Sequence, residues 1–121
     1  MYQNNTDSEQ AFQCTNNSNF QMDVNGFRIS IFFGPGAYVS DRDIRFNRDF
    51  DAPSNHRMWG TDSAEVRIWN RKGIPIEWSN GDTVVGFCSS DTVARFIACL
   101  AWWAGNDDPT SMLNQINSAQ D

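Results

Sequence analysis

The dipeptide Asn25-Gly26 constrains the fold of this chain more than any other local feature. It separates two stretches in which apolar and polar residues alternate, with apolar residues at Phe20, Met22, Val24, Phe27, Ile29, Ile31 and Phe33. Both residues of the pair tolerate the positive φ angles of a type I′ turn, so the pattern predicts a β-hairpin. We expect Phe27, Ile29 and Ile31 to line its core face.

Three later segments also have strand character. Residues 64–69 alternate with period two, residues 74–78 resemble a short strand, and residues 83–88 follow a turn at Asn80-Gly81. Pro75 has no N–H to donate to a ladder, which favours an edge position for the segment that contains it. The segments from 20 to 88 therefore predict four or five short strands.

A helix is predicted after residue 89. Ser89, Ser90 and Asp91 supply a helix N-cap with an acidic first turn. Apolar residues then recur at helical spacing, and Gly105 supplies the stop; they are Val93, Phe96, Ile97, Leu100, Ala101 and Ala104. Trp102 points nearly opposite this stripe. We therefore expect a second contact there, with the C-terminal tail or with another subunit. Residues 110–119 are expected to form a short last helix.

These elements predict an α+β fold. The expected architecture is a mainly antiparallel sheet of four or five strands, with one principal helix packed on it and a long inserted loop. The length of 121 residues suits one domain. Residues 1–18 are dominated by Asn, Gln, Ser and Thr, and we expect most of them to be poorly ordered. The predicted single α+β domain is residues 19–121.

The inserted loop, residues 34–62, is longer than an ordinary connection in a compact domain. Structureless loops beyond about 12–15 residues are usually functional or disordered, and disordered linkers are poor in aromatic residues. Aromatic faces stack on bases and arginine forks grip phosphates. The candidate ligand-binding residues are Tyr38, Ser40, Arg42, Arg45, Arg48, His56, Arg57 and Trp59. The alternative is that the aromatic residues form a small satellite core under the loop.

Catalytic and metal-binding patterns are weaker. The acidic pairs Asp41-x-Asp43 and Asp49-x-Asp51 could offer oxygens to Mg²⁺ or Ca²⁺, but arginines beside them compete for the carboxylates. A loop pinned by Asp–Arg hydrogen bonds is therefore favoured. His56 is the sole histidine, and no motif marks a serine or cysteine as its partner. We predict no catalytic residue, no metal site and no cofactor.

Charge and hydropathy limit the partners. The net charge of −6 argues against general affinity for long nucleic acid or an anionic membrane. No apolar run approaches the roughly 18 residues of a membrane span, and the N-terminus lacks signal-peptide character. Three widely spaced cysteines form neither a disulfide framework nor a zinc ligand set. These features predict a cytosolic protein.

Four segments resemble a group of small, mostly uncharacterised proteins of tailed bacteriophages. They are residues 25–27 (NGF), 33–40 (FGPGAYVS), 62–69 (DSAEVRIW) and 86–94 (GFCSSDTVA), the last at a strand-into-helix junction. The resemblance implies a phage origin and a related fold. It carries no functional residue across, because none of the segments is a catalytic motif. Small phage accessory proteins often bind a host protein or trap a host signalling molecule, which is an analogy of origin only.

The expected function is that of a small non-enzymatic binding protein encoded by a phage. It would act against host defence in the host-cell cytoplasm by sequestering a small anionic, nucleotide-derived signalling ligand. One alternative is a protein–protein inhibitor of a host enzyme or defence protein. The other, less supported, is a small metal-dependent hydrolase that uses the Asp pairs. Self-association through the region of Trp102 is also expected. The sequence does not specify the ligand.

Overall fold

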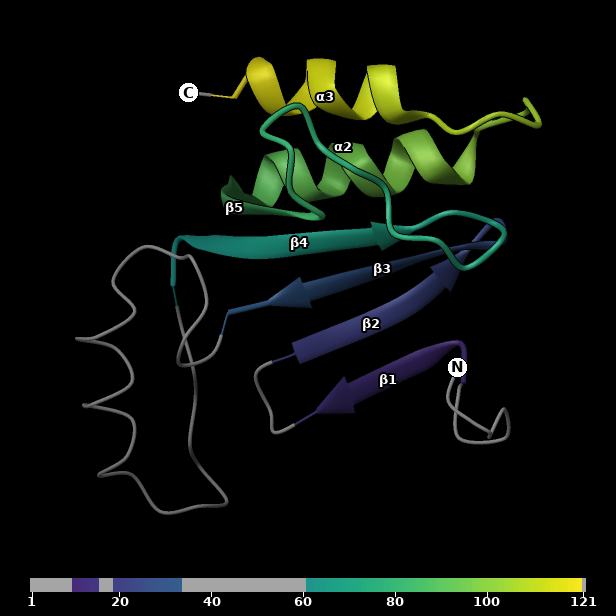
Figure 1. Ribbon diagram of the computed structural model, residues 1–121. Coiled ribbons are helices and arrows are strands. Elements are labelled where there is room, and N and C mark those ends of the chain that lie inside the picture. Colours follow the sequence, from purple (N-terminus) through teal and green to yellow (C-terminus); the bar gives the residue numbers. More distant parts are fainter. Residues whose placement is uncertain (1–9, 16–18, 34–60, 121) are drawn as a thin grey trace.

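A computed structural model describes residues 10–15, 19–33 and 61–120 of the chain (Figure 1). Within these ranges the fold is a five-stranded antiparallel sheet with two helices packed on it, which confirms the predicted α+β class. The strands lie in the order of the chain: β1 (Phe12–Thr15), β2 (Asn19–Val24), β3 (Phe27–Phe32), β4 (Ser63–Trp69) and β5 (Val84–Ser89).

The predicted hairpin is strands β2 and β3. Asn25 has φ 53° and Gly26 has φ 84°, so both turn residues adopt the left-handed conformation that a type I′ turn requires. Met22 lies opposite Ile29 in the ladder. Phe27 and Ile29 are buried, and half-buried Ile31 packs against the core. The predicted core face of the hairpin is therefore confirmed.

Strand β5 carries an irregularity opposite β4. Ala64 pairs with Cys88 and Val66 pairs with Val85, so two residues of β5 stand opposite the single residue Glu65. One of the two is Phe87, which has φ 57° and an exposed side chain. A positive φ is unusual for a bulky residue, and this one marks a β-bulge.

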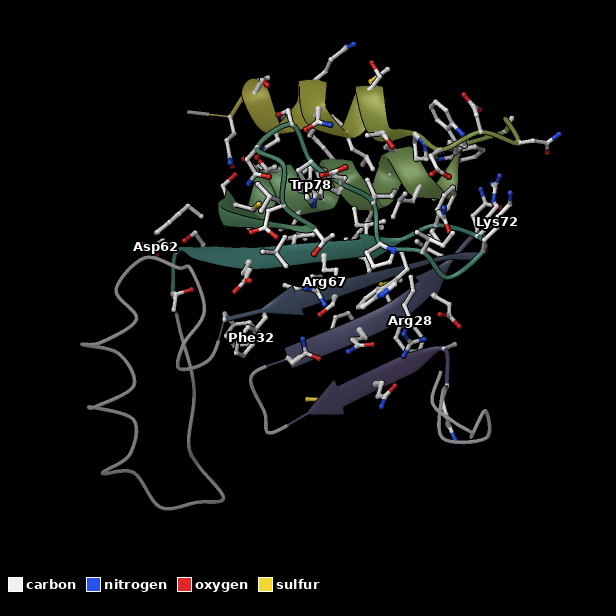
Figure 2. All side chains as sticks on the ribbon, in the orientation of Figure 1. Arg28, Phe32, Asp62, Arg67, Lys72 and Trp78 are labelled. Carbon is white, nitrogen blue, oxygen red and sulfur yellow. The ribbon has the colours of Figure 1, made fainter. Side chains whose placement is uncertain are left out.

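The fifth strand differs from the one expected. Residues 74–78 form only an isolated bridge, between Trp69 and Pro75, so the prediction of a short strand there is wrong. The segment instead folds onto α2 (Ser90–Ala101), where the ring centroid of Trp78 lies 5.2 Å from that of Phe96. Figure 2 shows Trp78 in this position. Pro75 has no N–H to donate to a ladder, so the backbone pairing with β4 stays short: Ile76 donates to the carbonyl of Ile68 at 2.8 Å, and Trp78 beyond it is buried in the core.

Strand β1 takes the fifth place in the sheet. It comes from residues 1–18, most of which were expected to be poorly ordered, and this strand was not anticipated. The remainder of that segment, apart from Gln10 and Ala11, lies outside the described residues. Two interactions hold β1 in place: the rings of Phe12 and Phe20 lie 6.1 Å apart, and Arg28 donates to the side chain of Gln13 at 2.8 Å.

The two helices cover one face of the sheet in successive layers. Helix α2 packs against β2, β4 and β5, and α3 (Thr110–Ser118) lies on the far side of α2 (Figure 1). Ser89 is the N-cap of α2, as predicted, because its Oγ accepts the N–H of Thr92 at 3.1 Å. The core contains Phe27, Ile29, Val66, Ile68, Ile76, Trp78, Val85, Cys88, Phe96, Leu100 and Leu113. Neither helix is long and apolar enough to cross a membrane, and no other helix lies in the described ranges.

Candidate functional site

All eight predicted ligand-binding residues lie in residues 34–60, outside the described part of the chain. They are Tyr38, Ser40, Arg42, Arg45, Arg48, His56, Arg57 and Trp59. The acidic pairs at 41–43 and 49–51 also lie there. The described residues do, however, include the two that flank this segment, Phe33 and Thr61.

Phe33 and Thr61 both line a pocket of about 330 Å³. The pocket lies where β3 ends, β4 begins and α2 starts, near the position of Asp62 in Figure 2. Its described lining residues are Ile31, Phe33, Thr61, Asp62, Ser63, Ala64, Cys88, Ser90 and Val93. Pockets that hold small molecules begin at about this size. The residues that flank the predicted binding segment therefore both line a small-molecule-sized pocket.

The pocket lining is mainly apolar. Ile31, Ala64 and Val93 supply aliphatic surface, and Phe33 supplies an aromatic ring. The hydroxyl of Thr61 donates to the carbonyl of Ser63, so it is already engaged. A lining of this kind suits a flat apolar or aromatic group whose few polar atoms remain at the rim.

Cys88 is a potential nucleophile in the pocket wall, but its environment keeps it protonated. The residue is fully buried, and burial raises the pKa of its thiol to about 12. The Sγ lies 3.7 Å from the carbonyl oxygen of Val85. Because the thiolate is the reactive form, Cys88 is unreactive at neutral pH and serves as a small hydrophobic residue behind the pocket wall.

The start of α2 offers little for an anion. Ser89 already caps the N–H of Thr92, and Asp91 places a carboxylate in the first turn. The described pocket residues include no Arg or Lys. A bound phosphate would therefore need cations from elsewhere in the chain.

A second surface is the sheet face opposite the helices. Arg28 on this face is saturated: it pairs with Asp23 at 2.6 Å and donates to the side chains of Gln21 and Gln13. Only 13% of its side chain is exposed, so its role is structural. Figure 2 labels Arg28 on β3 and Arg67 on the neighbouring strand β4.

The guanidinium of Arg67, unlike that of Arg28, does not have all of its nitrogen atoms hydrogen-bonded within the described part of the chain. It donates to Thr83 at 3.2 Å, and its guanidinium carbon lies 5.9 Å from the ring centroid of Trp69. Its Nε is buried and has no hydrogen-bond partner among the described residues. The alternation of residues 64–69 placed Arg67 and Trp69 on one face, but sequence reasoning did not select them. A binding role for Arg67 and Trp69 would require a ligand or partner that covers this face of the sheet.

Three of the described aromatic side chains are largely exposed, and one of them is Phe12 on β1, at 67%. Trp102, at the end of α2, is 87% exposed, and Phe87, on the bulge of β5, is 59% exposed. Helix α3 packs on α2 without covering Trp102, so among the described residues the C-terminal tail does not provide the second contact expected there. Contact with another subunit remains the prediction.

Sequence reasoning missed the pocket residues because each resembles an ordinary core or turn residue. The one sequence feature that included pocket residues was the strand-into-helix junction at residues 86–94, which contains Cys88, Ser90 and Val93. No protein-family model, curated protein or solved structure matches the chain. In residues 10–15, 19–33 and 61–120, no three His, Cys, Asp or Glu side chains cluster as metal ligands would.

Proposed function

We propose that this protein is a non-enzymatic binding protein that sequesters a small anionic, nucleotide-derived ligand. The base occupies the pocket beside Val93, and arginines of residues 34–60 hold the phosphate. One observation carries the proposal: Phe33 and Thr61, which flank the arginine- and aromatic-rich segment, both line a pocket of about 330 Å³. The pocket supplies apolar surface, and the segment supplies the cations that the pocket lacks.

The chemistry of the two parts is complementary. Stacking and apolar contact suit a base, whereas arginine forks suit phosphate oxygens. The protonated thiol of Cys88 favours reversible binding over covalent attack at the pocket wall. A small ligand also suits the net charge of −6, because long polyanions would be repelled.

The biological setting of the proposal comes from the resemblance to tailed-bacteriophage proteins. A phage protein that traps a nucleotide signal in the host cytoplasm would blunt a defence response. This part is an analogy of origin, and the binding experiment tests the ligand class independently of it.

Calorimetric titration of nucleotides and cyclic nucleotides tests the proposal. Val93→Trp fills the pocket, and Ala94→Trp is its matched control, because Ala94 is exposed on the same helix. We expect parent and Ala94→Trp to bind alike and Val93→Trp to bind at least about tenfold more weakly, a loss of about 1.4 kcal/mol.

The arginines are tested one at a time. Arg42→Ala, Arg45→Ala, Arg48→Ala and Arg57→Ala are titrated at unchanged melting temperature. Losing one important arginine removes a charge-assisted contact of roughly 1.5–3 kcal/mol, so binding should weaken about tenfold or more. If every variant instead loses stability, the arginines are structural partners of the loop aspartates. If the folded parent binds no nucleotide, the sequestration proposal fails.

A second candidate is a protein–protein inhibitor of a host enzyme or defence protein. The observation that favours it is Trp102, 87% exposed at the end of α2. Tryptophan is enriched among residues that dominate binding energy at interfaces. Co-purification from host cells would compare the parent, Trp102→Ala and Ile74→Ala, the last a control at another exposed apolar position. A partner retained equally by all three would contradict this role for Trp102.

A further inference from the structure

The outer edge of β1 presents backbone groups that no described strand uses. The carbonyl of Ala11 accepts the N–H of Asp23 at 2.8 Å, so residue 11 faces β2. Backbone groups in an antiparallel ladder alternate between the two sides of a strand. Gln13 therefore faces β2 as well, while Phe12 and Cys14 direct their N–H and C=O groups outward. Two donors and two acceptors are left at this edge.

The opposite edge of the sheet is protected. Strand β5 carries the bulge at Phe87, and its edge groups are engaged at both ends. The carbonyl of Val84 accepts from the side chain of Asn80 at 3.4 Å. The N–H of Ser89 donates to the side chain of Gln120 at 3.0 Å. Bulges and capping groups of this kind discourage pairing with another chain.

Strand β1 is only four residues long, but between Phe12 and Thr15 it carries neither a bulge nor a capped edge group. Residues 10–22 contain no charged side chain, although the chain carries a net charge of −6. Two copies can therefore approach at this edge with little like-charge repulsion. Phe12 is 67% exposed and Cys14 is exposed on the same face of the strand. Uncharged, unbulged edge strands are templates for strand pairing.

We infer that two copies of this chain pair antiparallel through β1 and join their sheets into one. A two-fold axis normal to the sheet at Gln13 places Phe12 of each copy opposite Cys14 of the other. Both of these pairs use outward-facing backbone groups, which gives four main-chain hydrogen bonds. The same register places the exposed ring of Phe12 against the second copy's Cys14. A second copy fits this edge because the register is self-complementary in both backbone and side chains.

Sedimentation velocity of the full chain over a range of concentrations, in reducing buffer, tests the inference. The parent should approach twice its mass of 13.7 kDa as the concentration rises. Cys14→Pro removes an outward N–H and leaves the β1–β2 ladder intact, since proline is tolerated where the N–H faces outward from an edge strand. We expect this variant to need at least tenfold higher concentration to dimerise. Cys14→Ser keeps the N–H and should dimerise like the parent.

A second variant keeps the test valid if Cys14→Pro misfolds. Phe12→Lys places an edge lysine, a natural protecting device, at an exposed position and should also remain monomeric, with a small loss of stability because its ring contact with Phe20 is removed. A parent that stays monomeric at the highest concentration overturns the inference. So does loss of the dimer in Cys14→Ser, or a dimer that Trp102→Ala dissociates while Cys14→Pro and Phe12→Lys leave it intact. The last result would place self-association at α2.

Discussion

The side-chain amide of Asn25 donates a hydrogen bond of 2.9 Å to the carbonyl of Leu100, which lies 75 residues further along the chain. The same amide donates to the carbonyl of Trp103 at 2.9 Å. The turn residue of the β2–β3 hairpin therefore also caps the C-terminal end of α2. Arg71 strengthens the junction, because it donates to the carbonyls of Trp103 and Gly105.

Replacing Asn25 should separate its two roles. Asn25→Gly keeps the positive φ of the turn but loses both donors, and should cost about 1–2 kcal/mol of unfolding free energy. Asn25→Asp should cost more, because its carboxylate would face the carbonyls at the negative end of the α2 dipole. Urea denaturation measures both. An aspartate variant as stable as the glycine variant would contradict the capping role.

The core face of the hairpin is tested at Ile29. Ile29 is fully buried between Met22 and Ile68 of the adjacent strands, so Ile29→Asp would bury an unpaired charge. We expect loss of the folded state, a cost of more than about 4 kcal/mol. Ile74→Asp is the matched control at an exposed position and should melt like the parent. If Ile29→Asp also melts like the parent, this strand register is wrong.

Cys88 should make stability fall at alkaline pH. Burial raises its pKa from the ordinary 9.0 to about 12, so the folded state holds the proton more tightly than the unfolded state. The stabilisation is complete below pH 9 and is lost as the pH rises from 9 towards 12, by up to about 1.4 kcal/mol per pH unit. Denaturation curves of parent and Cys88→Ala between pH 7.5 and 10.5, a range of about 3 units, measure this. Parallel pH profiles for the two proteins would rule it out.

The adjacent residues Trp102 and Trp103 should differ sharply in their effect on stability. Trp102 is 87% exposed, so Trp102→Ala should change the unfolding free energy by no more than about 0.5 kcal/mol. Trp103 packs against the core, and its indole N–H donates to the carbonyl of Asp107 at 2.8 Å. Trp103→Ala should cost about 2 kcal/mol or more. Thermal and urea unfolding distinguish the two, and equal losses would mean that Trp102 is covered in solution.

Phe87 should be a source of backbone strain. Its φ of 57° lies in the left-handed region, which costs a side-chain-bearing residue roughly 1–2 kcal/mol. Phe87→Gly relieves this cost, whereas Phe87→Ala retains it, and both lose the same exposed ring. The glycine variant should therefore be the more stable by about 1 kcal/mol. Equal stabilities would show that the bulge is unstrained. A strained, exposed aromatic residue that lowers stability is expected to be retained for binding.

Some of the candidate site followed from the sequence, and some did not. The length of residues 34–62 and their arginine and aromatic content predict a binding segment, and this stays a prediction because residues 34–60 lie outside the described part of the chain. The pocket could not be predicted from the sequence, because its walls come from residues as far apart as Ile31 and Val93. In the sequence each wall residue resembles an ordinary core residue. The pocket forms only in the folded protein, where the end of the sheet lies next to the start of α2. The incomplete hydrogen bonding of the Arg67 side chain likewise could not be predicted from the sequence, because its neighbours lie in other segments of the chain.

The sequence by itself determined the hairpin and the start of α2, because both are decided by residues a few positions apart. Asn25-Gly26 and its flanking alternation specify the turn, and the hydroxyl of Ser89 caps the N–H three residues later. Only the tertiary structure decided which segment became the fifth strand. Residues 74–78 alternate like a strand, yet Trp78 is buried against Phe96, while Phe12–Thr15 pairs with β2. Alternation indicates that side chains will be buried, but the partner that buries them lies elsewhere in the chain and is selected by packing.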